Sequence, residues 1–157
     1  MKNLVKGLLT GAVIIILVTA GYASAGQNNS PGIPKEAAKK AIEHQTKGNI
    51  LEDDGKLNDA ITEYKESLKY NPEDVNTLFN LGVVYLKANS AKEAAAVFEK
   101  LTKAAPGDAE AYNLLGIAYR GAGREADAKK AWGKSLAINP NQPNVKKMMQ
   151  DNISQRQ

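Results

Sequence analysis

Apolar residues recur at helical spacing in the middle of the chain, from residue 75 to residue 108. Leu78, Leu81 and Tyr85 follow one another at i, i+3 and i+7, which places them on one face of a helix. A second face of the same kind is formed by Ala94, Val97, Phe98 and Leu101. The dipeptide Asn89-Ser90 separates the two segments, and Pro106 follows the second. The pattern predicts two amphipathic helices joined by a short turn and ended by proline.

The same pattern returns when the window is moved by 34 residues toward either end of the chain. Glycine and alanine hold two of the repeated positions, and they leave room where two helices approach closely. An aromatic residue holds the third position and fills the space between neighbouring hairpins, while proline in the fourth ends the second helix. The four columns are Gly48, Gly82 and Gly116; Ala60, Ala94 and Ala128; Tyr64, Phe98 and Trp132; and Pro72, Pro106 and Pro140. A fixed period of this length is typical of a helical repeat protein.

Each copy also has a signal for the turn between its two helices. Gly55 and Gly123 provide a tight turn in the first and third copies. In the middle copy, Ser90 and Glu93 have the spacing of a capping box, which predicts that the Ser90 hydroxyl caps the second helix.

The middle copy resembles the tetratricopeptide repeat (TPR) family. The residues that carry the resemblance are Leu81-Gly82 with Tyr85, Ala94 with Phe98, and Pro106. The resemblance extends from about Ala41 to Gln142 and is strongest in the second and third copies. It implies an all-α fold, a right-handed solenoid of helical hairpins, with three repeats at residues 41–74, 75–108 and 109–142 within a repeat region that begins at residue 35.

The first copy departs from the family pattern. His44, Lys47 and Leu51 stand where the family has a bulky apolar residue, a leucine and a tyrosine. We therefore expect this copy to be packed more loosely than the other two.

Residues 1–25 have the outline of a secretory signal peptide. Lys2 and Lys6 form a positive region, residues 8–20 an apolar core, and Ala23-Ser24-Ala25 an A-x-A cleavage site. The uncharged run from residue 7 to residue 25 would be about 28 Å long as a helix, against a membrane core of roughly 30 Å, so an uncleaved anchor is the alternative. Both interpretations place the repeats outside the cytoplasm. We expect an exported, periplasmic protein or, alternatively, one anchored in the inner membrane and facing the periplasm.

Two further segments flank the repeats. Residues 26–34 contain two prolines, two glycines and no charge, and they predict a linker. The first helix is expected from Pro34-Lys35 to about Glu52, with Ile42 and Ile50 among its apolar residues. Residues 143–157 predict a capping helix that covers the last repeat and ends in a frayed tail. Its apolar stripe is Val145, Met148, Met149 and Ile153.

Composition excludes several classes of function. The chain of 157 residues has no cysteine, which excludes disulfides, thiolate metal sites and cysteine nucleophiles. Its formal net charge is +4, of which Lys2 and Lys6 contribute two. That balance is too mild to argue for nucleic acid, which needs a clustered basic face.

No arrangement of residues argues for an enzyme, a cofactor or a metal site. His44 is the single histidine and has no second metal ligand at i+3 or i+4, so we expect a partly buried structural histidine. The acidic run from Glu52 to Gly55 lacks the alternating ladder of a calcium loop and predicts a solvated turn. Gly121-Ala122-Gly123 lacks the third glycine of a phosphate loop and predicts an interhelical turn. The repeated aromatic column is expected in packing rather than in an aromatic cage.

The resemblance implies that the first helix of each repeat lines a groove that binds a protein segment. The candidate partner-binding residues in this groove are Asn49, Asn76, Phe79, Val83, Leu86, Asn113, Ile117 and Arg120, with Gln45, Glu52 and Glu110 beside them. Apolar side chains in a groove are typical of a binding site. The alternative is that the linker or the capping helix already covers them.

One TPR subtype holds the terminal carboxylate of a peptide with two asparagines and three cationic residues. Asn49 and Asn80 match the asparagines, but the cationic positions are held by Gln45, Glu110 and Leu114. Without positive charge, recognition of a terminal carboxylate is disfavoured.

The sequence thus predicts a non-enzymatic protein-binding adaptor or scaffold in the cell envelope. Residues 41–74 carry nine acidic and four basic side chains, whereas the later repeats are weakly basic, so head-to-tail self-association is also open. A chaperone-like factor for an envelope or cytochrome maturation complex is a further alternative. The expected partner is another protein or peptide segment, not nucleic acid, and membrane contact is expected only through the N-terminal segment.

Overall fold

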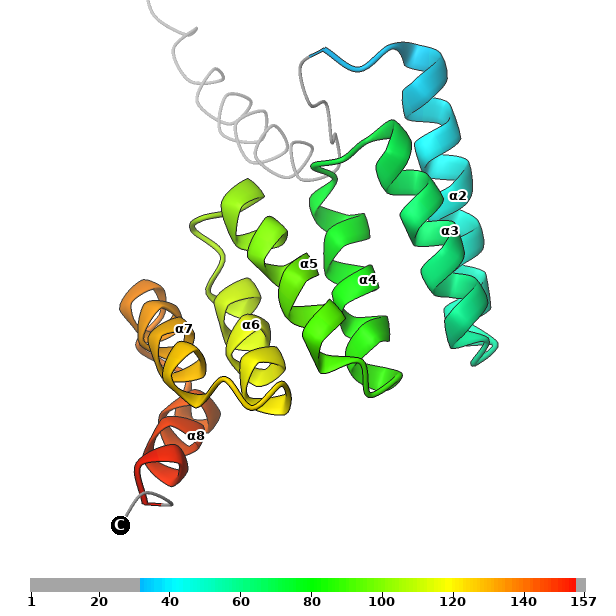
Figure 1. Ribbon diagram of the computed structural model, residues 1–157. Helices are drawn as coiled ribbons and strands as arrows, with labels where there is room; N and C mark the ends of the chain where they lie inside the picture. The colour runs from blue at the N-terminus through cyan, green and yellow to red at the C-terminus, as the bar shows by residue number, and fades with distance from the viewer. Residues whose placement is uncertain (1–31, 155–157) are drawn as a thin grey trace, which may run out of the picture.

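Figure 1 shows the computed structural model, in which the helices stand side by side in a stack. The structure describes the backbone of residues 32–154 and the side chains of residues 32–150, so the predicted signal peptide lies outside the described residues. Within this part of the chain it has seven helices and no strand. The helices are α2 (Lys35–Asp53), α3 (Leu57–Tyr70), α4 (Val75–Lys87), α5 (Ala91–Ala104), α6 (Ala109–Gly121), α7 (Glu125–Ile138) and α8 (Pro143–Ser154).

Consecutive helices pair into three hairpins, α2–α3, α4–α5 and α6–α7, and each hairpin contacts the next. Helix α8 packs on α7 at the C-terminal end of the stack. The predicted all-α arrangement of helical hairpins with a capping helix is confirmed. Of the described residues, no helix is long and apolar enough to cross a membrane.

One residue with a positive φ angle shapes the turn within each hairpin. Gly55, Asn89 and Gly123 have φ angles of +75°, +56° and +76°, in the left-handed region that glycine and asparagine tolerate best. The N–H of the following residue then donates to a carbonyl near the end of the first helix. These three bonds are all 2.8 Å long and join Lys56 to Leu51, Ser90 to Tyr85, and Arg124 to Tyr119.

The predicted capping box at Ser90 and Glu93 is wrong. Ser90 precedes α5, but its side chain makes no capping hydrogen bond, and the turn is shaped instead by the left-handed Asn89. The side-chain caps that form are at α4 and α6. Asp74 accepts from the N–H of Thr77 at 2.7 Å, and Asp108 accepts from that of Glu110 at 2.8 Å. Each aspartate lies two residues after a column proline, a sequence signal that could have revealed both caps.

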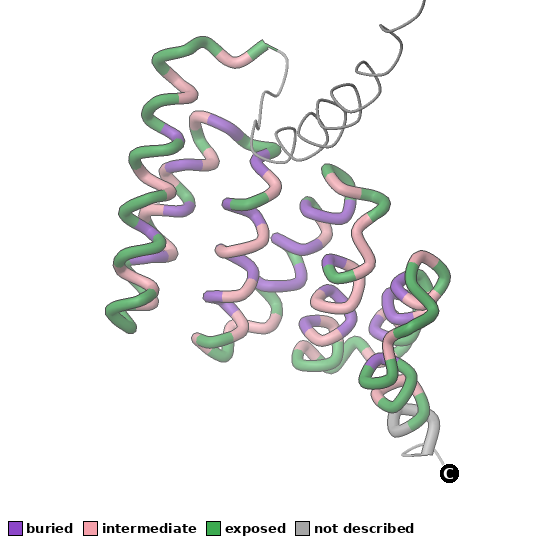
Figure 2. Tube along the Cα trace, turned by 180° about the vertical axis from the view of Figure 1, so that it is seen from behind, coloured by how far each residue is buried: buried purple, intermediate pink, exposed green. Residues whose placement is uncertain are grey.

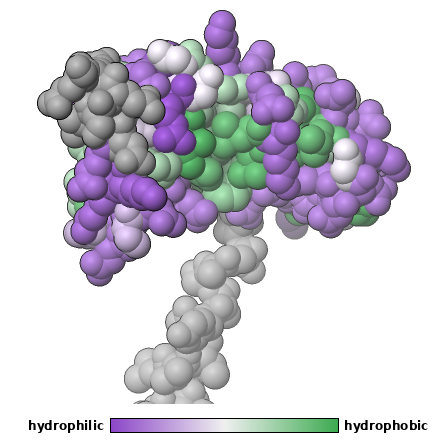
Figure 3. Space-filling view, turned by 90° about the horizontal axis from the view of Figure 1, so that it is seen from below, coloured by the Kyte–Doolittle hydropathy of each residue, from purple (hydrophilic) through white to green (hydrophobic). Residues whose placement is uncertain are grey.

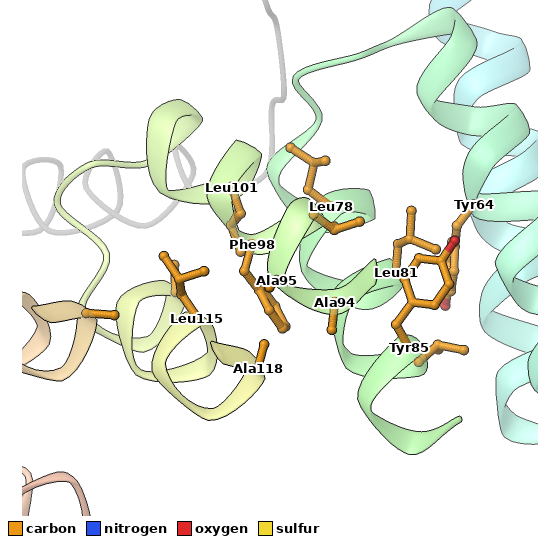
Figure 4. Packing of buried hydrophobic residues seen from close by; sticks show 14 of the residues in the cluster. Tyr64, Leu78, Leu81, Tyr85, Ala94, Ala95, Phe98, Leu101, Leu115 and Ala118 are labelled. Carbon is orange, nitrogen blue, oxygen red and sulfur yellow. The ribbon is translucent and has the colours of Figure 1, made fainter. Parts of the chain in front are cut away.

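The glycine and aromatic columns meet inside each hairpin. A Cβ atom placed on Gly48 would lie 2.6 Å from the ring of Tyr64, and one on Gly82 would lie 2.5 Å from the ring of Phe98. Gly116 and Trp132 are equally close. All three rings are fully buried, so they serve packing and not an aromatic cage. Figure 4 shows Phe98 among the buried residues of α4, α5 and α6, and Tyr64 beside Leu81 and Tyr85 of the next hairpin.

The first repeat is not looser at this contact, contrary to expectation. Gly48 abuts Tyr64 as closely as the other pairs do, and Tyr64 is completely buried. The polar residues His44 and Lys47 stand at positions that are apolar in the family for a different reason. Helix α2 lies at the end of the described stack (Figure 1). Lys47 is exposed there, whereas Leu81 and Leu115 in the same column are buried. His44 is partly buried, as expected, with Nδ1 2.6 Å from Glu63 and its ring stacked on Tyr70.

The C-terminal end of the stack is covered by α8. Val145 is buried with Ala128 and Trp132, and Met148 and Met149 pack against this cluster. The side chain of Ile153, the fourth member of the predicted stripe, lies outside the described residues.

Candidate protein-binding face

The outward-facing residues of the three first helices form what we call the first-helix face. It comprises Gln45, Asn49 and Glu52 of α2; Asn76, Phe79, Val83 and Leu86 of α4; and Glu110, Asn113, Ile117 and Arg120 of α6. Helix α4 contacts both α2 and α6 directly, so the three helices present adjoining strips of surface. By this definition the face includes the eight candidate residues predicted from the sequence, and their role in binding stays a prediction.

The α4 strip is the apolar part of the face. Phe79, Val83 and Leu86 are half-buried, and each packs on its inner side against the main hydrophobic core. Their remaining surface is open in the described structure, while Asn76 at the start of the strip is exposed. Figure 3 looks at the end of the molecule where the hairpin turns lie, and it shows apolar surface in the middle with hydrophilic surface around it. Leu86 is near this end, close to the C-terminus of α4.

The α2 strip is polar and is held by a hydrogen-bond network. The Tyr64 hydroxyl lies 2.8 Å from Oδ1 of Asn49 and 2.8 Å from Oε2 of Glu52. The other carboxylate oxygen of Glu52 accepts from Nζ of Lys87 at 2.7 Å, and Nδ2 of Asn80 donates to Oδ1 of Asn49 at 3.0 Å. Burial, together with the Glu52 carboxylate, raises the pKa of Tyr64 above its usual range. The network ties the first hairpin to the second, and it means that the Asn49 carbonyl already has donors.

The α6 strip combines opposite charges with one apolar residue. Glu110 and Arg120 are exposed near its two ends, and Arg120 lies over the ring of Trp132 at 5.3 Å. Ile117, between them, is half-buried against the cluster of Ala128, Trp132 and Val145. One member of this cluster, Val145, comes from α8. Oδ1 of Asn113 is buried and accepts no hydrogen bond from the described residues.

Three described cavities lie away from this face. They have volumes of about 410, 400 and 230 Å³, and their linings include Gly55 and Asn58, Pro72 and Lys100, and Tyr112 and Lys134, respectively. None of them includes a residue of the first-helix face. Among the described residues no group of three His, Asp or Glu side chains is placed to hold a metal ion.

The structure also shows why the carboxylate-binding pattern is incomplete here. Asn49 and Asn80 do come together, as the pattern requires, but they bond to each other. Lys87 reaches the same hydrogen-bond network, and its charge is paired with Glu52. The sequence carries no sign of this role for Lys87, because its position lies outside the repeat motif. The role depends on a contact with Glu52, which is 35 residues earlier and on another helix.

Comparison with known proteins agrees with this architecture. The family profile described as "Tetratricopeptide repeat" matches residues 51–116 and 88–151. The chain belongs to the tetratricopeptide repeat family. TPR domains generally mediate protein–protein interactions, and the TPR fold is typically non-enzymatic.

Two curated relatives match this TPR chain over a small part of their own length. It is 39% identical over 123 residues to the probable UDP-N-acetylglucosamine–peptide N-acetylglucosaminyltransferase SPINDLY of Solanum lycopersicum, a match that covers 76% of this chain and 13% of that protein. The second relative, TPR-containing protein trd-1 of Caenorhabditis elegans, is 30% identical, and 14% of it is covered. The chain therefore spans about one-seventh of the length of these relatives.

Solved TPR structures superimpose on most of the chain. MamA (41-end) from Desulfovibrio magneticus RS-1 has a TM-score of 0.69 at 28% identity, covering 74% of this chain and 66% of that one. The second TPR domain of human RPAP3, solved with the HSP70 peptide SGPTIEEVD, has a TM-score of 0.68 at 20% identity, covering 74% of this chain and 97% of that domain.

Proposed function

We propose that this protein is an exported adaptor that binds a segment of a partner protein on its first-helix face. The observation that carries the proposal is the α4 strip, where Phe79, Val83 and Leu86 are only half-buried in the described structure. Because Phe79 and Val83 are already half-buried, covering their remaining surface with a partner contributes on the order of 1 kcal/mol each before the cost of ordering the partner. The TPR domain of RPAP3 with its bound HSP70 peptide supports a peptide ligand as the class of partner.

The polar residues of the face indicate the chemistry of that segment. Its centre should be apolar, to cover α4. Glu110 and Arg120 stand ten residues apart on α6, about 15 Å along the helix, and neither forms an ion pair with a described residue. A segment with a basic residue near Glu110 and an acidic residue near Arg120 would complement both. Strongly acidic peptides are disfavoured, since Glu52 and Glu110 belong to the same face.

The cell envelope is the proposed location. It rests on the positive region, apolar core and A-x-A site of residues 1–25. Sequencing the N-terminus of the protein recovered from cells distinguishes a cleaved signal peptide from an anchor, because an anchored chain begins at Met1. Recovery of the chain from the cytoplasm, starting at Met1, would contradict export.

Replacing residues of the α4 strip tests the binding proposal. Phe79→Glu places a charge in the apolar centre and should abolish capture of the partner from the native envelope. Asn76→Lys changes an exposed residue on the same strip without touching the core, so it keeps the test valid if Phe79→Glu unfolds. Ala96→Glu, at an exposed position on α5, is the matched control. Capture that both strip variants leave unchanged, with circular dichroism unaltered, would refute the first-helix face as the binding site.

A further inference from the structure

Helix α2 exposes apolar residues at the edge of the stack. Ile42 and Ile50 retain 61% and 58% of their accessible surface, and they are the large apolar residues that stay exposed in the described part of the chain. Figure 2 shows α2 at one edge, with exposed residues along much of its length. Both isoleucines are among the apolar residues expected for this helix, and in the structure they lie on its exposed side.

The repeat itself shows that the position of Ile50 is normally a buried one. Val84 and Ala118 stand in the same column, 34 and 68 residues later, and both are completely buried. Helices α4 and α6 each have a hairpin before them in the stack, whereas α2 has none among the described residues. An isoleucine kept at this open position is a candidate contact for another chain.

Five of the exposed residues of α2 form a stripe with a symmetric arrangement. Lys39, Ile42, Thr46, Ile50 and Asp53 follow at i, i+3, i+7, i+11 and i+14, which places them on one side of the helix. Ile42 and Ile50 are each four residues from Thr46, and Lys39 and Asp53 are each seven residues from it. At equal distances on the two sides of Thr46, isoleucine therefore corresponds to isoleucine, and the positive Lys39 corresponds to the negative Asp53.

We propose that α2 pairs with α2 of a second copy of this chain, antiparallel and centred on Thr46. In this arrangement each Ile42 packs on the partner's Ile50, and each Lys39 faces the partner's Asp53. A two-fold axis repeats both contacts, as an isologous interface requires. The charges are available, because Lys39 approaches only Glu43 at 3.9 Å and Asp53 forms no ion pair with a described residue. The interface is independent of partner binding on the first-helix face.

Cysteine cross-linking tests the position of the axis, since the chain has no cysteine of its own. Thr46→Cys places two thiols at the centre of the interface. Thr62→Cys on α3 is the matched control, because both threonines are exposed and each donates to the carbonyl four residues earlier, at 2.8 Å and 3.0 Å. Under mild oxidation of the whole protein as purified from cells, the Thr46→Cys variant should form disulfide dimers about tenfold faster than the control.

Charge exchange tests the antiparallel register. Lys39→Asp or Asp53→Lys alone turns two ion pairs into two repulsions and should weaken the dimer, measured by light scattering, by about tenfold. Mixing the two variants restores both opposite-charge contacts in a heterodimer, so association should return. Both positions are exposed, and circular dichroism should show unchanged helicity.

Three outcomes would overturn the proposal. They are a wild-type protein that stays monomeric across the concentrations used, equal cross-linking rates at positions 46 and 62, and a mixture of charge variants that stays dissociated. A monomer with an unreactive Thr46→Cys thiol would mean that residues before position 32, or another protein, cover α2 instead.

Discussion

The contact between glycine and the aromatic ring in each hairpin predicts that a glycine-to-alanine substitution in the helix destabilises the protein, which is the opposite of its usual effect. Replacing a helical glycine by alanine normally stabilises a helix by about 1 kcal/mol, because alanine restricts the unfolded backbone and has the higher helix propensity. At Gly82 the added methyl group would lie 2.5 Å from a ring carbon of Phe98, which is completely buried, so the ring or the helix must shift. Overpacking of this kind costs about 1–3 kcal/mol. Gly82→Ala should therefore lower the free energy of unfolding by up to about 2 kcal/mol in net terms.

Gly133 provides the matched control for this prediction. It is also helical, in α7, but a methyl group there would meet nothing within 4 Å. Gly133→Ala should raise the free energy of unfolding by up to about 1 kcal/mol, since only the propensity gain remains. The gain is common to both variants, so the difference between them measures the clash alone and should be about 1–3 kcal/mol.

Urea unfolding followed by circular dichroism at 222 nm measures both variants under the same conditions. A second substitution, Phe98→Leu, should make Gly82→Ala less costly, because it removes the ring that the methyl group strikes. If Gly82→Ala stabilises the protein as much as Gly133→Ala does, the ring does not lie on the glycine and the packing described here is wrong.

Three further predictions concern caps, a buried hydroxyl and pH. Asp108→Ala should lower the free energy of unfolding by about 1 kcal/mol, while Ser90→Ala should leave it nearly unchanged, because only the aspartate caps its helix; equal effects in urea unfolding would contradict the caps. Ser135→Ala should cost about 1 kcal/mol in the same assay, since its hydroxyl donates to the carbonyl of Ala109 at 2.6 Å, and a neutral effect would argue against that bond. Burial and the hydrogen bond to Glu99 raise the pKa of Tyr119 to about 12. As the pH rises, the Tyr119 hydroxyl therefore loses its proton in the unfolded state before it does so in the folded state, and the free energy of unfolding should fall between pH 10 and pH 12. Tyr119→Phe should flatten that fall, and an unchanged pH profile would exclude the shift.

The architecture could be predicted from the sequence because each repeat carries the same information at the same positions. A period of 34 residues with glycine, alanine, aromatic and proline columns gives the number of hairpins, their turns and their packing side. The capping helix followed from Pro143 and the apolar residues after it. The resemblance to the TPR family implied that Asn76, Phe79 and Ile117 line the binding face, and their role in binding stays a prediction.

What could not be predicted depends on contacts between repeats and on the ends of the stack. The capping-box motif of Ser90 competes with the left-handed turn at Asn89, and sequence spacing does not show which prevails. The link from Lys87 to Glu52 joins two hairpins through positions outside the motif. The residues equivalent to Lys47 and Ile50 in the second and third repeats are buried. Lys47 and Ile50 are exposed only because they lie at the end of the described stack.

Site-specific photo-cross-linking in living cells tests the central claim, that the first-helix face holds the partner. A photoreactive residue at position 76, exposed on α4, should cross-link to a partner protein in the envelope fraction, while the same residue at position 126, exposed on α7, should not. Cross-links of equal strength from both positions, or from position 126 alone, would contradict the account.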